Sequence, residues 1–261
     1  MINEVDFIHP LEEIFFEEMM RTIGFDKQIM FYYKNYTQKM EMPDLIGKTV
    51  KATENQFTKL YQLNQELSNF IGIETPDIYV YEDFYYGVES KGAGPYWIEI
   101  SAKTLWDFSE QELKFLLARE IADIYLKHTY YYTMIDKLLD AIQNSGSIVG
   151  SDTLKNYWKI VMYKWSRVSH YSSDNFGYLL TSEMKVCVSS IVKLILNNKY
   201  LAEKINIAEY IRQSEEINEF NDNVSNLTKM DEKVPYGPFR IKNLLAYASS
   251  TKGKKSLIAI N

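Results

Sequence analysis

The sequence predicts an α+β fold that is predominantly helical and contains a small β-sheet. Most of the 261 residues lie in stretches whose apolar residues recur at helical spacing, and two short stretches are rich in β-branched and aromatic residues. Only 11 glycines and 6 prolines interrupt these patterns, and no repeat or low-complexity linker divides them. We therefore expect a single domain over residues 1–261.

The composition excludes several classes of protein. With 46% hydrophobic and 25% charged residues the chain is typical of folded globular proteins, and its net charge of −6 argues against a nucleic-acid surface. No window holds 18 consecutive apolar residues, so we expect no membrane span. The single cysteine excludes an internal disulfide, and the first residues lack the features of a secretory signal. A cytoplasmic location is the simplest expectation.

The N-terminal half is expected to be helical before a sheet begins. Residues 1–50 read as a helical cap, with an apolar-periodic segment after Pro10 and a second one over 29–36. A further helix starts near residues 53–56 and ends at Gly72. Two strands are expected next, over residues 77–81 and 96–100.

Helices are expected to fill the rest of the chain. Ser109 and Glu112 form a capping box, from which an apolar stripe runs to about Tyr131. Four more helical patterns follow, over residues 157–171, 174–197, 207–220 and 239–248.

The helix after Ser109 contains Arg119-Glu120-Ile121-Ala122-Asp123, which has the spacing of the HExxH motif. In that motif the two histidines ligate zinc from one helix face, and the glutamate activates a zinc-bound water. Only the glutamate matches here, and an R-E-x-x-D string also arises as an ordinary ion pair on exposed helices. The surrounding sequence has to decide between these interpretations.

The order of segments around this motif resembles the HtpX-like and CAAX-prenyl-protease-like zinc metallopeptidases. The strand at Trp97–Ser101, the capped helix start at Ser109, the apolar run before the motif and the pair Lys127-His128 follow in the family's order. Residues 167–174 then align with the family pattern R-x-x-E-x-x-A-D. The resemblance extends over most of the chain and implies a zincin-like metallopeptidase fold with a small β-sheet packed on the active-site helix.

The resemblance also implies what the motif residues replace. It places Arg119, Asp123 and His170 at the three zinc-ligand positions and Glu120 at the position of the general base. Arginine cannot lose its proton in a protein and has no acceptor, so Arg119 opposes a bound cation. We expect Arg119 to pair with Asp123 and Glu120, and we expect no cofactor, although the resembling family uses zinc.

Two residues of the second segment are expected to have structural roles. Asp174 keeps the family's aspartate and is expected to hold Arg167 or a backbone amide beside the site.

Three further residues carry weaker expectations. On a continuous helix His128 lies about 140° from the face of Asp123, so a surface or packing role is expected; His9 is expected in a loop or cap, and Cys187 as a small buried hydrophobe.

The expected function is that of a catalytically inactive metallopeptidase-like protein, a pseudopeptidase, that binds a peptide or protein partner of unknown identity through a retained cleft. The strand near residues 96–101 is expected at the sheet edge, where it could pair with an extended peptide beside Tyr85, Tyr86 and Trp97.

Two alternatives stay open. The first is a metal-dependent peptidase that uses Asp123, His170 and Glu120 around a harder ion such as manganese or iron. The direction of the Arg119 guanidinium separates it from the pseudopeptidase, because a guanidinium turned to solvent would leave such a site possible. The second is an unrelated helical protein that matches the family by accident.

Overall fold

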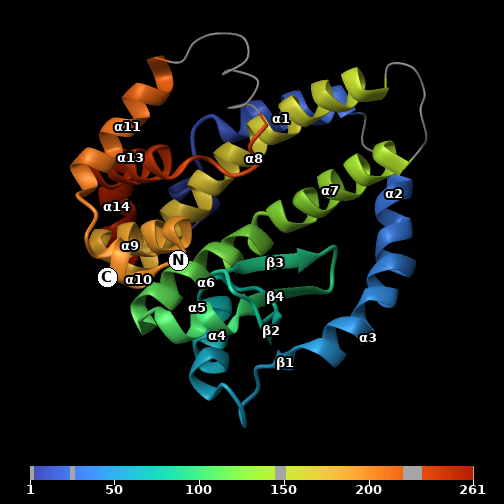
Figure 1. Cartoon of the computed structure of the whole chain (residues 1–261), viewed down its shortest axis with the longest axis horizontal. Coiled ribbons are helices and arrows are strands. Elements are labelled where there is room, and N and C mark those ends of the chain that lie inside the picture. Colours follow the sequence, from blue (N-terminus) through green and yellow to red (C-terminus); the bar gives the residue numbers. More distant parts are fainter. Residues whose placement is uncertain (1–2, 24–26, 145–150, 220–230, 261) are drawn as a thin grey trace.

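A computed structural model describes residues 3–23, 27–144, 151–219 and 231–260, and Figure 1 shows the chain. Helices predominate and a small sheet lies among them, which confirms the predicted fold class. The described helices are η1 (Glu4–Asp6), α1 (Glu12–Ile23), α2 (Lys27–Tyr32), η2 (Tyr33–Thr37), α3 (Gln38–Lys48), α4 (Thr58–Ile71), α5 (Ala102–Asp107), α6 (Glu110–Tyr125), α7 (His128–Asn144), α8 (Ser151–Thr181), α9 (Met184–Leu196), α10 (Lys199–Ala202), α11 (Ile207–Glu219), α13 (Gly237–Ser249) and α14 (Thr251–Ile260).

The sheet of the described residues has the strand order β1-β2-β4-β3. Its strands are β1 (Val50–Lys51), β2 (Asp77–Tyr81), β3 (Val88–Gly92) and β4 (Tyr96–Ser101). β2 and β4 are parallel, whereas β1 and β3 pair antiparallel to their neighbours. The two predicted strands are confirmed as β2 and β4. However, the expectation that residues 96–101 form an edge is wrong, because β4 lies between β2 and β3.

Helix α6 is central to the fold. It packs against α4, α7, α8, α9 and β3, and almost every residue from Glu112 to Ile124 is buried. The capping box predicted at its start is present, since Ser109 N–H donates to Glu112 Oε2 at 2.8 Å and Ser109 Oγ accepts from the Glu112 amide. Glu112 also forms an ion pair with Lys193 of α9 at 2.8 Å, which joins the two helices.

The helix predicted to run to Tyr131 instead ends earlier. Leu126 closes α6, and Lys127 has a left-handed φ of 63°. A lysine pays a steric cost in this region, so the conformation is held by the packing of the two helices around it. The chain therefore changes direction, and α7 starts at His128.

Several other boundaries also differ from the prediction. Residues 157–181 lie within one helix, α8, and the break falls at Ser182, which has a φ of 57°. The predicted helix over residues 207–220 is α11, with residue 220 outside the described part. Strand β3 and helix α14 were not predicted.

The core has two parts. The larger part lies between the sheet and helices α4, α6, α9 and α13, together with the end of α8. The smaller part lies between α1, α7 and the middle of α8. In Figure 1 α7 and α8 extend side by side away from the sheet, while α2 and α3 run along the flank of the molecule.

Candidate functional site

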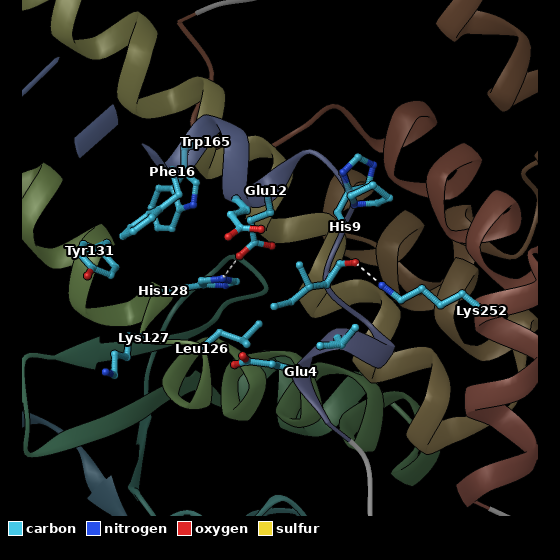
Figure 2. A pocket seen from close by; sticks show the side chains of 14 residues that line it. Glu4, His9, Glu12, Phe16, Leu126, Lys127, His128, Tyr131, Trp165 and Lys252 are labelled. Carbon is cyan, nitrogen blue, oxygen red and sulfur yellow. Dashed lines mark hydrogen bonds and ion pairs between the residues drawn. The ribbon is translucent and has the colours of Figure 1, made fainter. Parts of the chain in front are cut away.

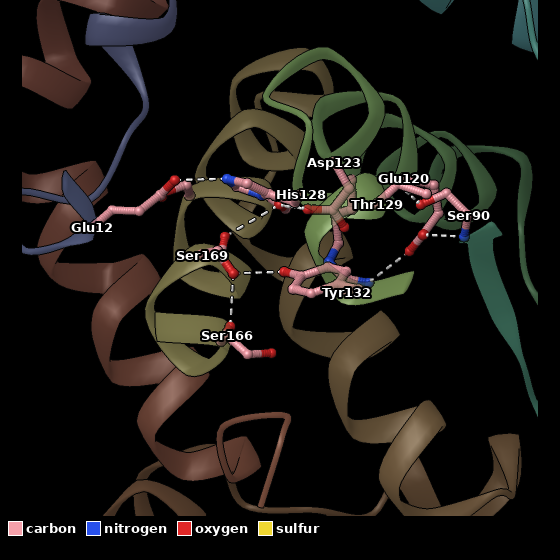
Figure 3. Close-up of polar contacts among 12 residues, drawn as sticks. Glu12, Ser90, Glu120, Asp123, His128, Thr129, Tyr132, Ser166 and Ser169 are labelled. Atoms are coloured by element: carbon pink, nitrogen blue, oxygen red, sulfur yellow. Dashed lines mark hydrogen bonds and ion pairs between the residues drawn. The ribbon is translucent and has the colours of Figure 1, made fainter. Parts of the chain in front are cut away.

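The motif residues of α6 lie where this helix meets α8, the start of α7, the strand β3 and the helix α1. Arg119, Glu120 and Asp123 are 5%, 5% and 2% exposed. Figure 3 shows the part of this cluster around Asp123 and Glu120. Charged groups at this depth are stable only when other groups neutralise and hydrogen-bond them, so their partners define what the site can do.

Arg119 is paired with Asp174 of α8. Its Nε donates to Asp174 Oδ1 at 2.6 Å, and Arg240 of α13 holds the same carboxylate with two further bonds, Nε to Oδ2 at 2.9 Å and Nη2 to Oδ1 at 2.7 Å. Burial alone would raise the pKa of Asp174, but the charges of Arg240 and Arg119 outweigh it and lower that pKa. One carboxylate thus joins α6, α8 and α13.

Two expectations about these residues were wrong. The main partner of Arg119 is Asp174 rather than Asp123, although Arg119 Nη1 also lies 3.7 Å from Glu120 Oε1. Arg167 does not bind Asp174; it donates from Nη1 to the carbonyl oxygen of Glu232 at 2.8 Å.

A glycine on α8 allows Arg119 to reach its partner. A Cβ atom at Gly177 would lie 2.7 Å from Phe115 Cδ2 and 3.1 Å from Arg119 Cγ, both of which are too close. Because Gly177 has no side chain, α6 and α8 approach closely at this point. The Arg119 side chain therefore passes over α8 next to Asp174, one turn earlier on the same helix.

Asp123 is engaged by His128 and Ser173. His128 Nδ1 lies 2.8 Å from Asp123 Oδ1, which also accepts a hydrogen bond from the Ser173 hydroxyl. On its other side His128 Nε2 lies 2.6 Å from Glu12 Oε1 of α1. His128 does not lie on the surface, because it is 2% exposed. It has the expected packing contacts, with Trp165 and Tyr132, and it also links two carboxylates, which was not expected (Figure 3).

The charge of His128 follows from these contacts. Burial lowers its pKa, but the charge of Glu12 and the hydrogen bonds to Asp123 and Glu12 outweigh burial and raise the pKa to about 9. His128 is therefore an imidazolium at neutral pH, and it donates from both nitrogens.

Glu120 points away from α8, toward the sheet. Its Oε2 accepts a hydrogen bond from the Ser90 amide of β3 at 2.7 Å. Burial and the nearby charge of Asp123 outweigh the opposite effect of Arg119, and together they raise the pKa of Glu120 to about 8. At neutral pH the carboxyl group is mostly protonated.

The charges of the cluster balance in this protonation state. With Glu120 neutral, the three buried cations match the three buried carboxylates: Arg119, Arg240 and His128 against Glu12, Asp123 and Asp174. A charged Glu120 would add a fourth anion to the cluster. Arg119 would not neutralise it fully, because Arg119 Nη1 lies 3.7 Å from Glu120 Oε1, which is beyond hydrogen-bonding distance. This explains physically why burial prevails at Glu120.

His170 makes contacts of a different kind. Its ring stacks on Tyr132 with centroids 5.2 Å apart and an angle of 26°, and among the described residues neither ring nitrogen has a hydrogen-bond partner. Burial, followed by the charges of Arg119, Arg240 and Lys233, lowers its pKa well below the usual value. The imidazole is therefore neutral.

These residues do not fit a zinc ion. The guanidinium of Arg119 lies inside the cluster, Asp123 is held by His128 and Ser173, and Arg119 and Arg240 lower the pKa of His170 by their positive charges. Among the described residues no three His, Cys, Asp or Glu side chains converge so as to hold a metal ion.

The aromatic residues expected around a peptide are not brought together. Trp97 is buried and donates to Glu99 Oε1 at 2.8 Å, and Tyr86 is buried with its hydroxyl 2.7 Å from Asp107 Oδ2. Of the three, only Tyr85 is strongly exposed, at 67%. The edge strand next to α6 is β3, which pairs with a neighbouring strand on one side only. On its other side the Ser90 amide already donates to Glu120.

Two hollows lie beside this cluster. One has a volume of about 490 Å³ and lies between the N-terminal segment, α1 and the start of α7, with the Glu12–His128 pair at its wall (Figure 2). The other has a volume of about 440 Å³ and lies between α3, β3 and α7. Its wall includes Ser90, whose amide binds Glu120, so this second hollow adjoins the motif helix.

A buried central helix that carries Arg119, Glu120 and Asp123, a long helix packed against it and a small sheet beside it are consistent with a metallopeptidase-like fold. The chain belongs to peptidase family M48, whose family model matches residues 54–248. It is similar to the plastoglobule-localized metallopeptidase 48, chloroplastic, of Arabidopsis thaliana, with 22% identity over 219 residues that cover 80% of this chain. These residues span 61% of the length of that relative. No solved structure matches the chain significantly.

No helix in the described ranges combines the length and the apolar character that crossing a bilayer requires.

Proposed function

We propose that this member of family M48 is a catalytically inactive peptidase, a pseudopeptidase, in which Arg119, Asp123 and His170 occupy the three positions of zinc ligands. Glu120 occupies the position of the general base. The observation that supports this most strongly is the buried bond between Arg119 and Asp174, because it holds a permanent cation at one of the proposed ligand positions.

The chemistry of the cluster supports inactivity at two steps. A zincin needs a metal ion to lower the pKa of a water molecule, and Arg119 repels that ion because it cannot lose its proton. A zincin also needs an ionised glutamate to accept the proton of the water. Glu120, with its pKa raised to about 8, is mostly protonated at pH 7 and is a poor acceptor.

The retained role is the binding of a peptide or protein partner. We place it in the hollow between α3, β3 and α7, because this hollow adjoins the motif helix and is bounded by the edge strand. Acidic residues outnumber basic residues in its lining, and this excess favours a partner with basic side chains. They are Glu41, Asp44, Glu89, Glu99 and Asp136 against Lys48, Lys91 and Lys137.

A metal-dependent peptidase is the second candidate, with Asp123, His170 and Glu120 as ligands of manganese or iron. One observation favours it: His170 is neutral, and its nitrogens are free of hydrogen bonds among the described residues. Against it, the Arg119 guanidinium is turned inward to Asp174 and is not swung to solvent. Peptide cleavage that depends on added manganese or iron, and that is lost in Glu120→Gln, would favour this candidate.

Restoring the family's zinc-ligand residues tests whether Arg119, Asp123 and His170 occupy the former ligand positions. The triple variant Arg119→His, Asp123→His and His170→Glu should bind about one equivalent of zinc and stay folded. A matched control places histidines at two exposed positions away from the cluster, Arg21→His and Asp44→His, and should bind none. Elemental analysis after dialysis gives the zinc content, and circular dichroism shows whether each variant folds. A folded triple variant without zinc would contradict the assignment.

The binding hollow is tested by blocking it. Peptides selected from a random display library on the wild-type chain should bind at least about tenfold more weakly to Thr133→Trp, because Thr133 lines the hollow. Lys254→Trp places the same side chain on the exposed surface of α14 and should leave the affinity unchanged. Equal affinities for wild type and Thr133→Trp would contradict this location.

A further inference from the structure

The helical arm formed by α2, η2 and α3 has an outer face that packs on nothing in the described structure. The arm runs from Lys27 to Lys48 along the flank of the molecule, as Figure 1 shows. Its inner face carries Met30 and Tyr33, which are 3% and 4% exposed and belong to the smaller part of the core. These inner contacts fix how the arm is rotated and therefore which residues face outward.

The outer face is rich in large apolar side chains. Phe31, Tyr32, Tyr36 and Met40 are 65%, 61%, 55% and 75% exposed. The rings of Tyr32 and Tyr36 stack with centroids 5.3 Å apart, so these two side chains share one face. A soluble helix normally turns such residues inward, and an exposed group of them marks an interaction surface.

The arm contains a π-helical turn, η2, at Tyr33–Thr37. A π-turn adds one residue and so sets the following side chains back by about 100° around the axis. In a regular helix Tyr36 and Met40 would rotate toward the face of Tyr33, which packs on the core. The π-turn instead keeps them in line with Phe31 and Tyr32 and gives one continuous apolar stripe.

The charge of the same segment is positive. From Lys27 to Lys48 the arm has four lysines and two acidic residues, Glu41 and Asp44, and no acidic residue lies between Lys27 and Met40. The whole chain, in contrast, has a net charge of −6. Lys27, Lys34 and Lys39 are all exposed. A segment that combines aromatic side chains with flanking lysines in this way has the character of helices that lie in a lipid–water interface.

We propose that the outer face of this arm binds the surface of an anionic lipid membrane. The aromatic side chains and Met40 enter the boundary between head groups and acyl chains, and the three lysines contact anionic head groups. This binding requires no membrane-spanning helix. It is independent of the pseudopeptidase assignment, because the former ligand positions lie on α6 and α8. None of Phe31, Tyr32, Tyr36 and Met40 lines the hollow between α3, β3 and α7.

A second group of exposed aromatic residues provides a matched control. Phe84 and Trp106 are 80% and 85% exposed. The acidic residues Glu82, Asp83 and Asp107 are their neighbours in the chain. We therefore do not expect this second group to bind an anionic surface.

The test is co-sedimentation of the full chain with vesicles of phosphatidylcholine alone or with one quarter phosphatidylglycerol. Wild type should bind the anionic vesicles, and raising the salt from about 0.05 to 0.5 M should weaken binding roughly tenfold or more. Lys27→Gln with Lys39→Gln should weaken it roughly 25-fold, about fivefold for each lysine. Phe31→Ser with Met40→Ser should weaken it at least about tenfold, while Phe84→Ser with Trp106→Ser should bind like wild type.

Several results would overturn the proposal. The first is that wild type does not sediment with anionic vesicles, and the second is that it binds neutral and anionic vesicles equally. The third is that the lysine variant and the Phe31→Ser, Met40→Ser variant both bind anionic vesicles as tightly as wild type. Self-association of the free chain that is abolished by Phe31→Ser with Met40→Ser would also overturn it, because the outer face would then bind a second copy of the chain. Thermal unfolding of each variant confirms that it is folded before its binding is compared.

Discussion

Arg119 Nε lies 2.6 Å from Asp174 Oδ1, and both side chains are almost completely buried between α6 and α8. Arg240 binds the same carboxylate from α13, so Asp174 neutralises two guanidinium groups at once. The centre of this M48 domain is therefore an ionic cluster that holds three helices together. Within the cluster, Arg119, Arg240 and His128 are the cations next to the carboxylates of Glu12, Asp123 and Asp174.

Removing the shared carboxylate should destabilise the fold strongly. Asp174→Asn leaves Arg119 and Arg240 buried without their anion, and breaking a buried pair in this way costs about 3–5 kcal/mol. Urea unfolding measures this change in the free energy of unfolding. Asp77→Asn breaks the exposed pair with Lys51 and should cost less than about 1 kcal/mol. Similar costs for the two variants would mean that Arg119 and Arg240 find other partners.

Glu120→Gln should gain stability relative to wild type as the pH rises. The pKa of Glu120 is raised from 4.5 to about 8 by burial and by Asp123, so its ionisation is penalised only in the folded state. Wild type therefore loses stability between about pH 4.5 and 8, and Gln, which can still accept the Ser90 bond, does not. Thermal unfolding at pH 5 and pH 8 measures the difference. A difference that stays constant between these values would show that Glu120 is already ionised at pH 5.

His128→Gln should remove a second pH dependence. The pKa of His128 is raised above 6.5 to about 9, because Glu12 and Asp123 outweigh burial. Its stabilising contribution is fully present below pH 6.5 and is lost as the pH rises through about 9. The melting temperature of wild type should therefore fall between pH 6.5 and 9.5, and that of His128→Gln should be lower at pH 6 and change less. An unchanged pH profile in the variant would contradict a charged His128.

Replacing His170 with phenylalanine should change the free energy of unfolding only slightly. The ring stacks on Tyr132, and its nitrogens have no partner among the described residues, so His170→Phe keeps the packing and removes unsatisfied polar atoms. We expect a change in the free energy of unfolding of less than about 1 kcal/mol. Tyr132→Phe should cost about 1 kcal/mol, because it loses the 2.6 Å bond to Ser169. A loss at His170 as large as that of Asp174→Asn would show that the imidazole has a buried partner or ligand.

The predictions that were confirmed rest on local sequence. The capping box at Ser109 and Glu112 involves residues three apart, and the strand at residues 77–81 is apolar and follows a proline. Their spacing alone specifies the local structure. Strand β3 was missed because Val88-Glu89-Ser90-Lys91-Gly92 has few β-forming residues, and it becomes a strand by pairing with β4.

The partners within the cluster depend on long-range packing. Arg119 and Asp174 are 55 residues apart, and Arg240 is 66 residues from Asp174, so spacing could not reveal that they meet. The role of His128 was missed for a different reason. Its placement assumed a continuous helix, whereas the left-handed Lys127 starts a new one and returns His128 to Asp123. A lysine carries no sequence indication of that conformation.

The zinc content of the wild-type chain tests most directly whether the cluster around Arg119 excludes a metal ion. The protein is purified without chelator, dialysed against a small excess of zinc and then against metal-free buffer, and analysed by elemental mass spectrometry. Because Arg119 occupies the cluster with Asp174, we expect no stoichiometric zinc to remain. About one equivalent of tightly held zinc per chain would contradict the account.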